Sequence, residues 1–221
     1  MLEPVPPRVR EYADQAVAYV QRALGIKLEY DSNTLPVLDH YLRTVPDDQP
    51  AALQLVVATS GAYFGEVVRH HLGGRWELGR EEAEWRIFLP TGINFSPAGF
   101  VAAAIARADL EDLDSEITAP SRMMPYLQQA LARMGEVSVD DYYSLCGRLD
   151  TLEHVHEVLV AVAAQMLGDA ADPDEELGVA ANGAVAHAAV DADDDDDDDD
   201  DEILGDTTPV PLTDDPSGPV N

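Results

Sequence analysis

The sequence predicts an α+β fold: a mostly helical single domain over residues 1–168 with a small antiparallel β-hairpin, followed by a disordered acidic tail over residues 169–221. Apolar residues recur every three or four positions through most of the first 168 residues, which is the spacing of a helix with one buried face. The longest stretch in which the spacing changes to two lies between Arg75 and Pro90. Beyond residue 168 there are 19 acidic residues and no Lys, Arg or aromatic residue, so that segment cannot form a core.

The first 50 residues predict two helices joined by a short extended stretch. Helical spacing over 9–24 ends at Gly25, a residue that commonly terminates helices. Alternation over 26–30 predicts an extended segment, and Ser32 or Asn33 is the expected N-cap of the second helix. The apolar residues on the buried face of that second helix are Leu35, Leu38, Leu42 and Val45.

A third helix is predicted over residues 50–72, ending at a Gly-Gly pair. Gly61 and Gly65 lie one turn apart, so we expect another element to pack closely against this face within the domain. The most apolar stretch of the chain, 51–68, belongs to this helix. Because polar residues such as Ser60 and Glu66 interrupt it, we expect it to be too polar to span a membrane.

Period-two alternation over residues 75–90 predicts the hairpin, with Trp76 and Trp85 on the face that packs on the helices. Phe88 lies on the opposite face, which indicates that a further strand or helix covers part of it. Ser96 followed by Pro97 predicts a helix start. Two more helical regions follow, over 123–134 and from Ser138 to about residue 166, the latter with Gly147 as a candidate break.

Charge and cysteine content limit the functional classes. The net charge is −30, of which the predicted domain carries −11 and the tail −19. Direct binding to nucleic acid or to anionic membranes needs clustered Lys or Arg, so we expect neither. A single cysteine, Cys146, and an N-terminus without a secretory signal predict a cytoplasmic protein in a reducing compartment, with Cys146 as a core residue.

The candidate site lies at the end of the third helix and in the hairpin, and consists of Glu66, Arg69, His70, Trp76 and Trp85. Glu66 and Arg69 are three residues apart and share a helical face. Two interpretations stay open. Glu66, Arg69 and His70 form a polar site that meets a ligand, or the Glu–Arg pair is structural and receives the indole of Trp76.

The same segment carries a family resemblance. The run Gly-Glu-Val-x-Arg at residues 65–69 and the run Gly-Gly-x-Trp at residues 73–76 resemble the helix-to-strand junction of uncharacterised bacterial domain families. Residues 85–90 and 96–100 are similar to the strand and helix that follow in that pattern. The resemblance covers residues 50–107 and implies a helix–hairpin–helix unit; it brings no established activity.

No catalytic, cofactor or formed metal site is predicted. His70 and His71 are adjacent, and His154 and His156 are two apart, so neither pair lines one helical face as zinc ligands do. The tail contains an unbroken aspartate run that begins at Asp193 and ends at Asp201, for which we expect only weak, diffuse association with divalent cations. The residues that match a calcium-loop pattern are Asp191, Asp193, Asp195 and Glu202, but Asp196 replaces its glycine.

These observations favour a non-catalytic, soluble bacterial binding or regulatory protein. The hairpin and its helices would be the interaction platform, in an immunity- or inhibitor-like role. The acidic tail would provide solubility or dock on a basic protein partner. The alternative is a metal-dependent hydrolase that uses carboxylates with His70 or His154.

Overall fold

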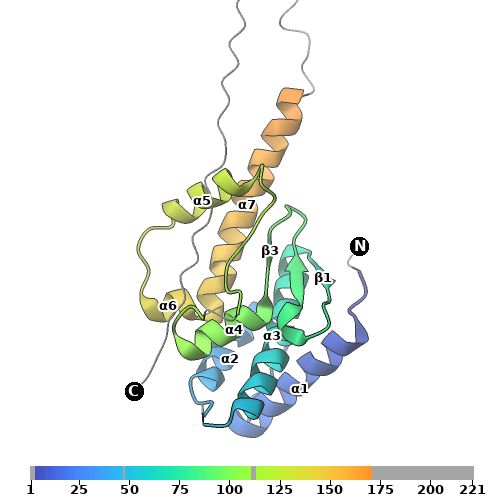
Figure 1. Cartoon of the computed structure of the whole chain (residues 1–221), viewed down its shortest axis with the longest axis vertical. Coiled ribbons are helices and arrows are strands. Elements are labelled where there is room, and N and C mark those ends of the chain that lie inside the picture. Colours follow the sequence, from blue (N-terminus) through green and yellow to red (C-terminus); the bar gives the residue numbers. More distant parts are fainter. Residues whose placement is uncertain (1–2, 47, 111–112, 171–221) are drawn as a thin grey trace, which may run out of the picture. The chain divides into compact units, whose positions relative to one another are not determined.

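A computed structural model describes residues 3–46, 48–110 and 113–170, with side chains described as far as Leu167. It confirms the predicted α+β class, since helices surround one small antiparallel sheet (Figure 1). The described residues belong to one compact unit. Apart from the helical backbone at residues 169 and 170, the predicted acidic tail lies outside the described residues, including the aspartate run from Asp193 to Asp201.

The N-terminal helices agree with the sequence pattern, and the cap of the second one differs from it. Helix α1 (Pro7–Leu24) ends at Gly25 in the left-handed conformation, and α2 (Leu35–Leu42) buries the predicted leucines. The extended segment expected at 26–30 is not a strand; its backbone turns at Tyr30, where φ is 55°. The N-cap of α2 is Thr34, without a side-chain cap, and not Ser32 or Asn33 as predicted. A 3-10 turn (Ser32–Thr34) precedes it, capped by Asp31, whose carboxylate accepts from the Thr34 N–H at 3.2 Å.

Helix α3 (Pro50–Leu72) packs along α1 and forms the centre of the domain (Figure 1). Its small residues serve the close packing predicted for them. A Cβ added at Gly61 would lie 2.9 Å from the backbone of Ala98 at the start of α4, and one at Gly65 would collide with the ring of Trp76. The glycine face therefore receives both the hairpin and the following helix.

The prediction that residues 51–68 are too polar to span a membrane does not hold for the composition of this helix. Among the described helices, α3 is long enough and, with a mean hydropathy of 1.3, apolar enough to cross a membrane by length and composition alone. In the structure, 56% of that stretch is buried inside the domain, as in the core helix of a folded protein.

The predicted hairpin is present and gains a third strand. Strands β1 (Arg75–Glu77) and β2 (Arg86–Phe88) are antiparallel with Trp76 opposite Ile87, and β3 (Asn94–Phe95) pairs with the other edge of β2. The added strand extends the sheet and does not lie over Phe88. Instead the Arg75 guanidinium stacks on Phe88, 4.8 Å from the ring centre.

The C-terminal part contains α4 (Pro97–Ala106), α5 (Met124–Arg133), α6 (Val139–Tyr143) and α7 (Leu145–Ala170). Ser96 caps α4 as predicted, its hydroxyl accepting from the Gly99 N–H at 3.1 Å. The break before the last helix falls at Ser144, whose backbone is extended, and not at Gly147. Gly147 is needed for space, because a Cβ there would collide with the carbonyl of Asp141.

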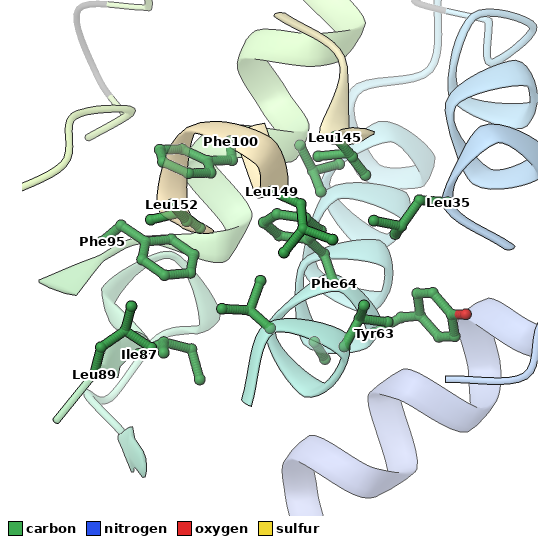
Figure 2. Close-up of a cluster of buried hydrophobic side chains, with 14 of the residues drawn as sticks. Leu35, Tyr63, Phe64, Ile87, Leu89, Phe95, Phe100, Leu145, Leu149 and Leu152 are labelled. Atoms are coloured by element: carbon green, nitrogen blue, oxygen red, sulfur yellow. The ribbon is translucent and has the colours of Figure 1, made fainter. Parts of the chain in front are cut away.

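One hydrophobic core joins these elements, and Figure 2 shows part of it. Phe64 of α3 lies near Phe95 and Phe100, and the rings of Phe95 and Phe100 stack at 4.8 Å. Leucines of α7 complete the cluster from the other side, namely Leu145, Leu149 and Leu152. The beginning of α7 is held by Asp39 of α2, whose carboxylate accepts from the N–H groups of Leu145 (2.8 Å) and Cys146 (3.2 Å).

Candidate functional site

Glu66 and Arg69 form a buried ion pair inside α3. Their side chains are each only 4% exposed, and the contact is bidentate: Nε donates to Oε1 and Nη2 donates to Oε2, both at 2.9 Å. Helical spacing of three residues places the guanidinium beside the carboxylate, as the sequence predicted. Burial of both charges makes each depend on the other, since an unpaired charge in the core is costly.

The remaining hydrogen-bonding capacity of the pair is used by neighbouring groups. The Trp76 indole Nε1–H donates to Glu66 Oε1 at 2.6 Å, and Arg69 Nη1 donates to the carbonyl of Glu3 at 3.1 Å. Arg69 Nη2 also lies 3.0 Å from His70 Nε2; since a guanidinium only donates, that ring nitrogen accepts. The geometry therefore favours the structural interpretation of the Glu–Arg pair, including the predicted role of the Trp76 indole.

Trp85, the fifth predicted site residue, belongs to a different cluster. It is buried and packs edge-on against Trp76 and Tyr12, with the Arg8 guanidinium 5.3 Å from its ring centre. Arg8 and Tyr12 both bond the carboxylate of Glu82. This cluster attaches α1 to the sheet. Trp76 and Trp85 pack against each other and do not form a cavity with His70, whose side chain is about half exposed.

A groove that the sequence did not predict lies among α5, α7 and residues 109–110 and 113–118. Its volume is about 630 Å³, within the range of small-molecule sites. Helix α5 packs on α7 (Figure 1) and supplies one wall. The apolar residues that line the groove are Leu110, Leu113, Ile117, Met124, Leu127, Leu131 and Tyr142.

Arg148 of α7 lines the same groove and is the least satisfied charged residue in the described part of the chain. It is only 5% exposed, and its Nε and Nη2 atoms have no hydrogen-bond partner among the described residues. Its guanidinium stacks between aromatic rings, 4.7 Å from the centre of Phe100 and 4.5 Å from that of Tyr142. Such stacking favours a cation but leaves its N–H groups unpaired.

The rim of the groove is acidic. Asp109, Asp114 and Glu116 line it, and Asp109 accepts from the Ser115 hydroxyl at 3.1 Å. Asp114 pairs with Arg86 at 2.6 Å; burial works against its ionisation, yet the bond from Arg86 holds the pKa of this carboxyl below its usual value. One fixed positive charge thus lies at the base of a negatively charged mouth.

Histidine and cysteine side chains are dispersed through the domain. His71 bonds Glu153 at 2.7 Å, while His156 Nδ1 contacts the Thr91 hydroxyl at 3.1 Å. Cys146 is partly buried and packs against the core, not within it as predicted. Burial, then the neighbouring Asp39 carboxylate, raises the pKa of its thiol to about 12, as expected for an unreactive cysteine. Within residues 3–46, 48–110 and 113–170, no three His, Cys, Asp or Glu side chains are grouped to hold a metal ion.

Sequence reasoning missed Arg148 because its surroundings come from distant segments. The available signal was an arginine on the apolar face of the last helix, one residue before the buried Leu149. Comparison with protein-family models, curated proteins and solved structures gives no match for this chain. The resemblance to bacterial domain families over residues 50–107 therefore stays a prediction.

Proposed function

We propose that this is a non-catalytic binding or regulatory protein whose ligand site is the groove between α5 and α7. The observation that carries the proposal is a groove of about 630 Å³ in which a nearly buried arginine lacks hydrogen-bond partners among the described residues. Buried polar groups are almost always paired, and exceptions call for a functional explanation. Small-molecule sites combine apolar walls with placed polar groups, and seven of the fifteen residues that line this groove are apolar or aromatic.

This proposal moves the binding site away from the hairpin. The Glu66–Arg69 pair bonds to Trp76 and Glu3 within the domain, which leaves it little capacity for a ligand. The groove combines unpaired donors with exposed apolar surface at Leu110, Leu131 and Tyr142, which are each at least 37% exposed. Both properties are typical of a surface that a partner covers.

Other parts of the proposal rest on the sequence alone. A bacterial origin, a cytoplasmic location and docking of the acidic tail on a basic protein partner follow from the resemblance, the single cysteine and the charge distribution. An immunity- or inhibitor-like role belongs to the same class of binding proteins. The metal-dependent hydrolase has no observation in its favour within the described residues, where no three His, Cys, Asp or Glu side chains are grouped to hold a metal ion.

Two neighbouring glutamines of α5 provide a matched test. Gln128 lines the groove, whereas Gln129 does not line it, and both are exposed. Titration of the full chain with the uncharged fluorescent probe N-phenyl-1-naphthylamine is expected to show saturable binding. Gln128→Trp should abolish that binding because its ring fills the groove, and Gln129→Trp should leave it unchanged. Absence of saturable binding to the wild-type protein, or equal binding by both variants, would refute the groove as a ligand site.

A further inference from the structure

We propose that the groove takes a small monocarboxylate with an apolar body, whose carboxylate is held by Nε and Nη2 of Arg148. This inference rests on the proposed function and names the ligand class for the same site. Neither the charge of the ligand nor the residue that selects it follows from the existence of a groove. Both follow from the hydrogen-bonding edge of Arg148 and from the charges around it.

The two unpaired atoms form one edge of the guanidinium. Nε–H and the outer N–H of Nη2 point in the same direction and are spaced to meet the two oxygens of a carboxylate. The domain contains this arrangement in completed form, because Arg69 binds the carboxylate of Glu66 through the same two atoms at 2.9 Å each. Arg148 presents that edge with no carboxylate among the described residues.

A guanidinium has N–H donors and no acceptor, so the two unpaired donors of Arg148 need an acceptor from another group. The aromatic rings of Phe100, Tyr142 and Tyr143 stabilise its charge through their faces, at 4.7, 4.5 and 5.7 Å. They supply no acceptor in the plane of the guanidinium. An anion in that plane would satisfy both donors without displacing the stacked rings of Phe100 and Tyr143.

The acidic rim selects against ligands with more than one negative charge. Asp109 and Glu116 repel anions at the mouth, and together they outnumber the single positive charge of Arg148, so each further negative charge on a ligand adds net repulsion. Arg86 does not offset this, because it is already paired with Asp114 and Asn94. Beside Arg148 the groove offers an aliphatic surface made of four leucines with Ile117 and Met124, and this surface accommodates an apolar body behind the carboxylate.

Access to the edge requires a neighbouring side chain to move, because the Nε and Nη2 atoms are shielded from solvent. Tyr142 is the most exposed of the aromatic residues that contact the guanidinium: it is 45% exposed and lies on the five-residue helix α6, so we expect its ring to be the one that shifts. The deeply buried Phe100 keeps its place below the guanidinium.

Three eight-carbon probes that differ in the head group test the charge rule on the wild-type chain. In calorimetric titrations we expect octanoate to bind with one site per chain, and octanamide and octylamine to bind about tenfold or more weakly, because charge-assisted bidentate contacts are the strong ones. Arg148→Lys keeps the positive charge but cannot make the bidentate contact with a carboxylate. The variant should therefore lose about tenfold in affinity for octanoate and little in affinity for octanamide. Glu116→Gln, at the exposed rim, should tighten octanoate binding.

The outcomes separate this inference from the proposed function. Equal affinity for octanoate, octanamide and octylamine, or a preference for octylamine, would overturn the carboxylate assignment while leaving the groove a binding site. Unchanged octanoate affinity in Arg148→Lys would also overturn it. Octyl phosphate that binds more tightly than octanoate would contradict the single-charge rule. If the neutral naphthylamine probe fails to bind as well, the proposed function itself fails.

Discussion

The domain contains two buried arginines whose surroundings differ in one respect. Arg69 and Arg148 are 4% and 5% exposed, and each sits on a long helix close to aromatic side chains. Arg69 is bonded to Glu66, Glu3 and His70, whereas Arg148 contacts rings and has two unpaired donor atoms among the described residues. The first arginine completes the fold. The second has two donor atoms without a partner among the described residues, which is why we assign function to α7 and not to α3.

The largest expected effect comes from removing the guanidinium at Arg69. Arg69→Met leaves the buried Glu66 carboxylate without its counterion, which should lower the free energy of unfolding by about 3–5 kcal/mol. Urea unfolding followed by circular dichroism measures the change. The double variant Glu66→Gln with Arg69→Met should recover part of the loss; if it is no more stable than Arg69→Met alone, the two residues are not a coupled pair.

The same substitution at Arg148 should change the free energy of unfolding far less than it does at Arg69. Arg148→Met loses stacking on Phe100 and Tyr142 but removes an unpaired buried charge, so we expect a change of within about 1 kcal/mol in the free energy of unfolding. A loss as large as that of Arg69→Met would mean that Arg148 supports the fold, and the contrast between the two arginines would disappear.

Asp39 sharpens the comparison because it fixes the start of the helix that carries Arg148. Asp39→Ala removes the acceptor for the N–H groups of Leu145 and Cys146 and should cost about 1–2 kcal/mol of stability, as for other helix caps. Hydrogen exchange at these two amides should increase more than exchange within α3. Uniform exchange across both helices would argue against a local capping role.

A substitution at Trp76 tests whether the Glu66–Arg69 pair is structural or binds a ligand. Trp76→Phe keeps a ring against Gly65 but removes the indole donor to Glu66, with an expected loss of about 1–2 kcal/mol. It should leave octanoate binding unchanged, since Trp76 does not line the groove. A change in affinity without a change in stability would revive the hairpin as a ligand site.

The smallest effect concerns pH. Burial lowers the pKa of His156, so the unfolded chain takes up a proton there at a higher pH than the folded chain does. This contribution to stability is present above the ordinary histidine pKa of about 6.5 and is lost as the pH falls below it. His156→Gln should therefore reduce the fall in the free energy of unfolding between pH 7.5 and pH 5.5. An equal fall in the variant would exclude His156 as its source.

Local signals were enough to predict most of the helices and the hairpin. Gly25, Gly73 and Ser96 act on their own neighbours, and the Glu66–Arg69 contact follows from helical spacing. Where the sequence prediction was wrong, a contact between residues distant in the sequence decided the outcome. The carboxylate of Asp39 caps the start of the last helix, 106 positions further along the chain, and the guanidinium of Arg75 covers Phe88. The groove joins segments whose proximity no spacing rule encodes.

The Nε–H resonances of the two arginines test the central claim most directly. In proton–nitrogen NMR spectra of the full chain, titration with octanoate should move the Arg148 Nε–H signal downfield in a saturable manner as the hydrogen bond forms. The Arg69 signal, already bonded to Glu66, should stay in place. An Arg148 signal that does not move while octanoate binds, or one that moves together with that of Arg69, would contradict a carboxylate site at Arg148.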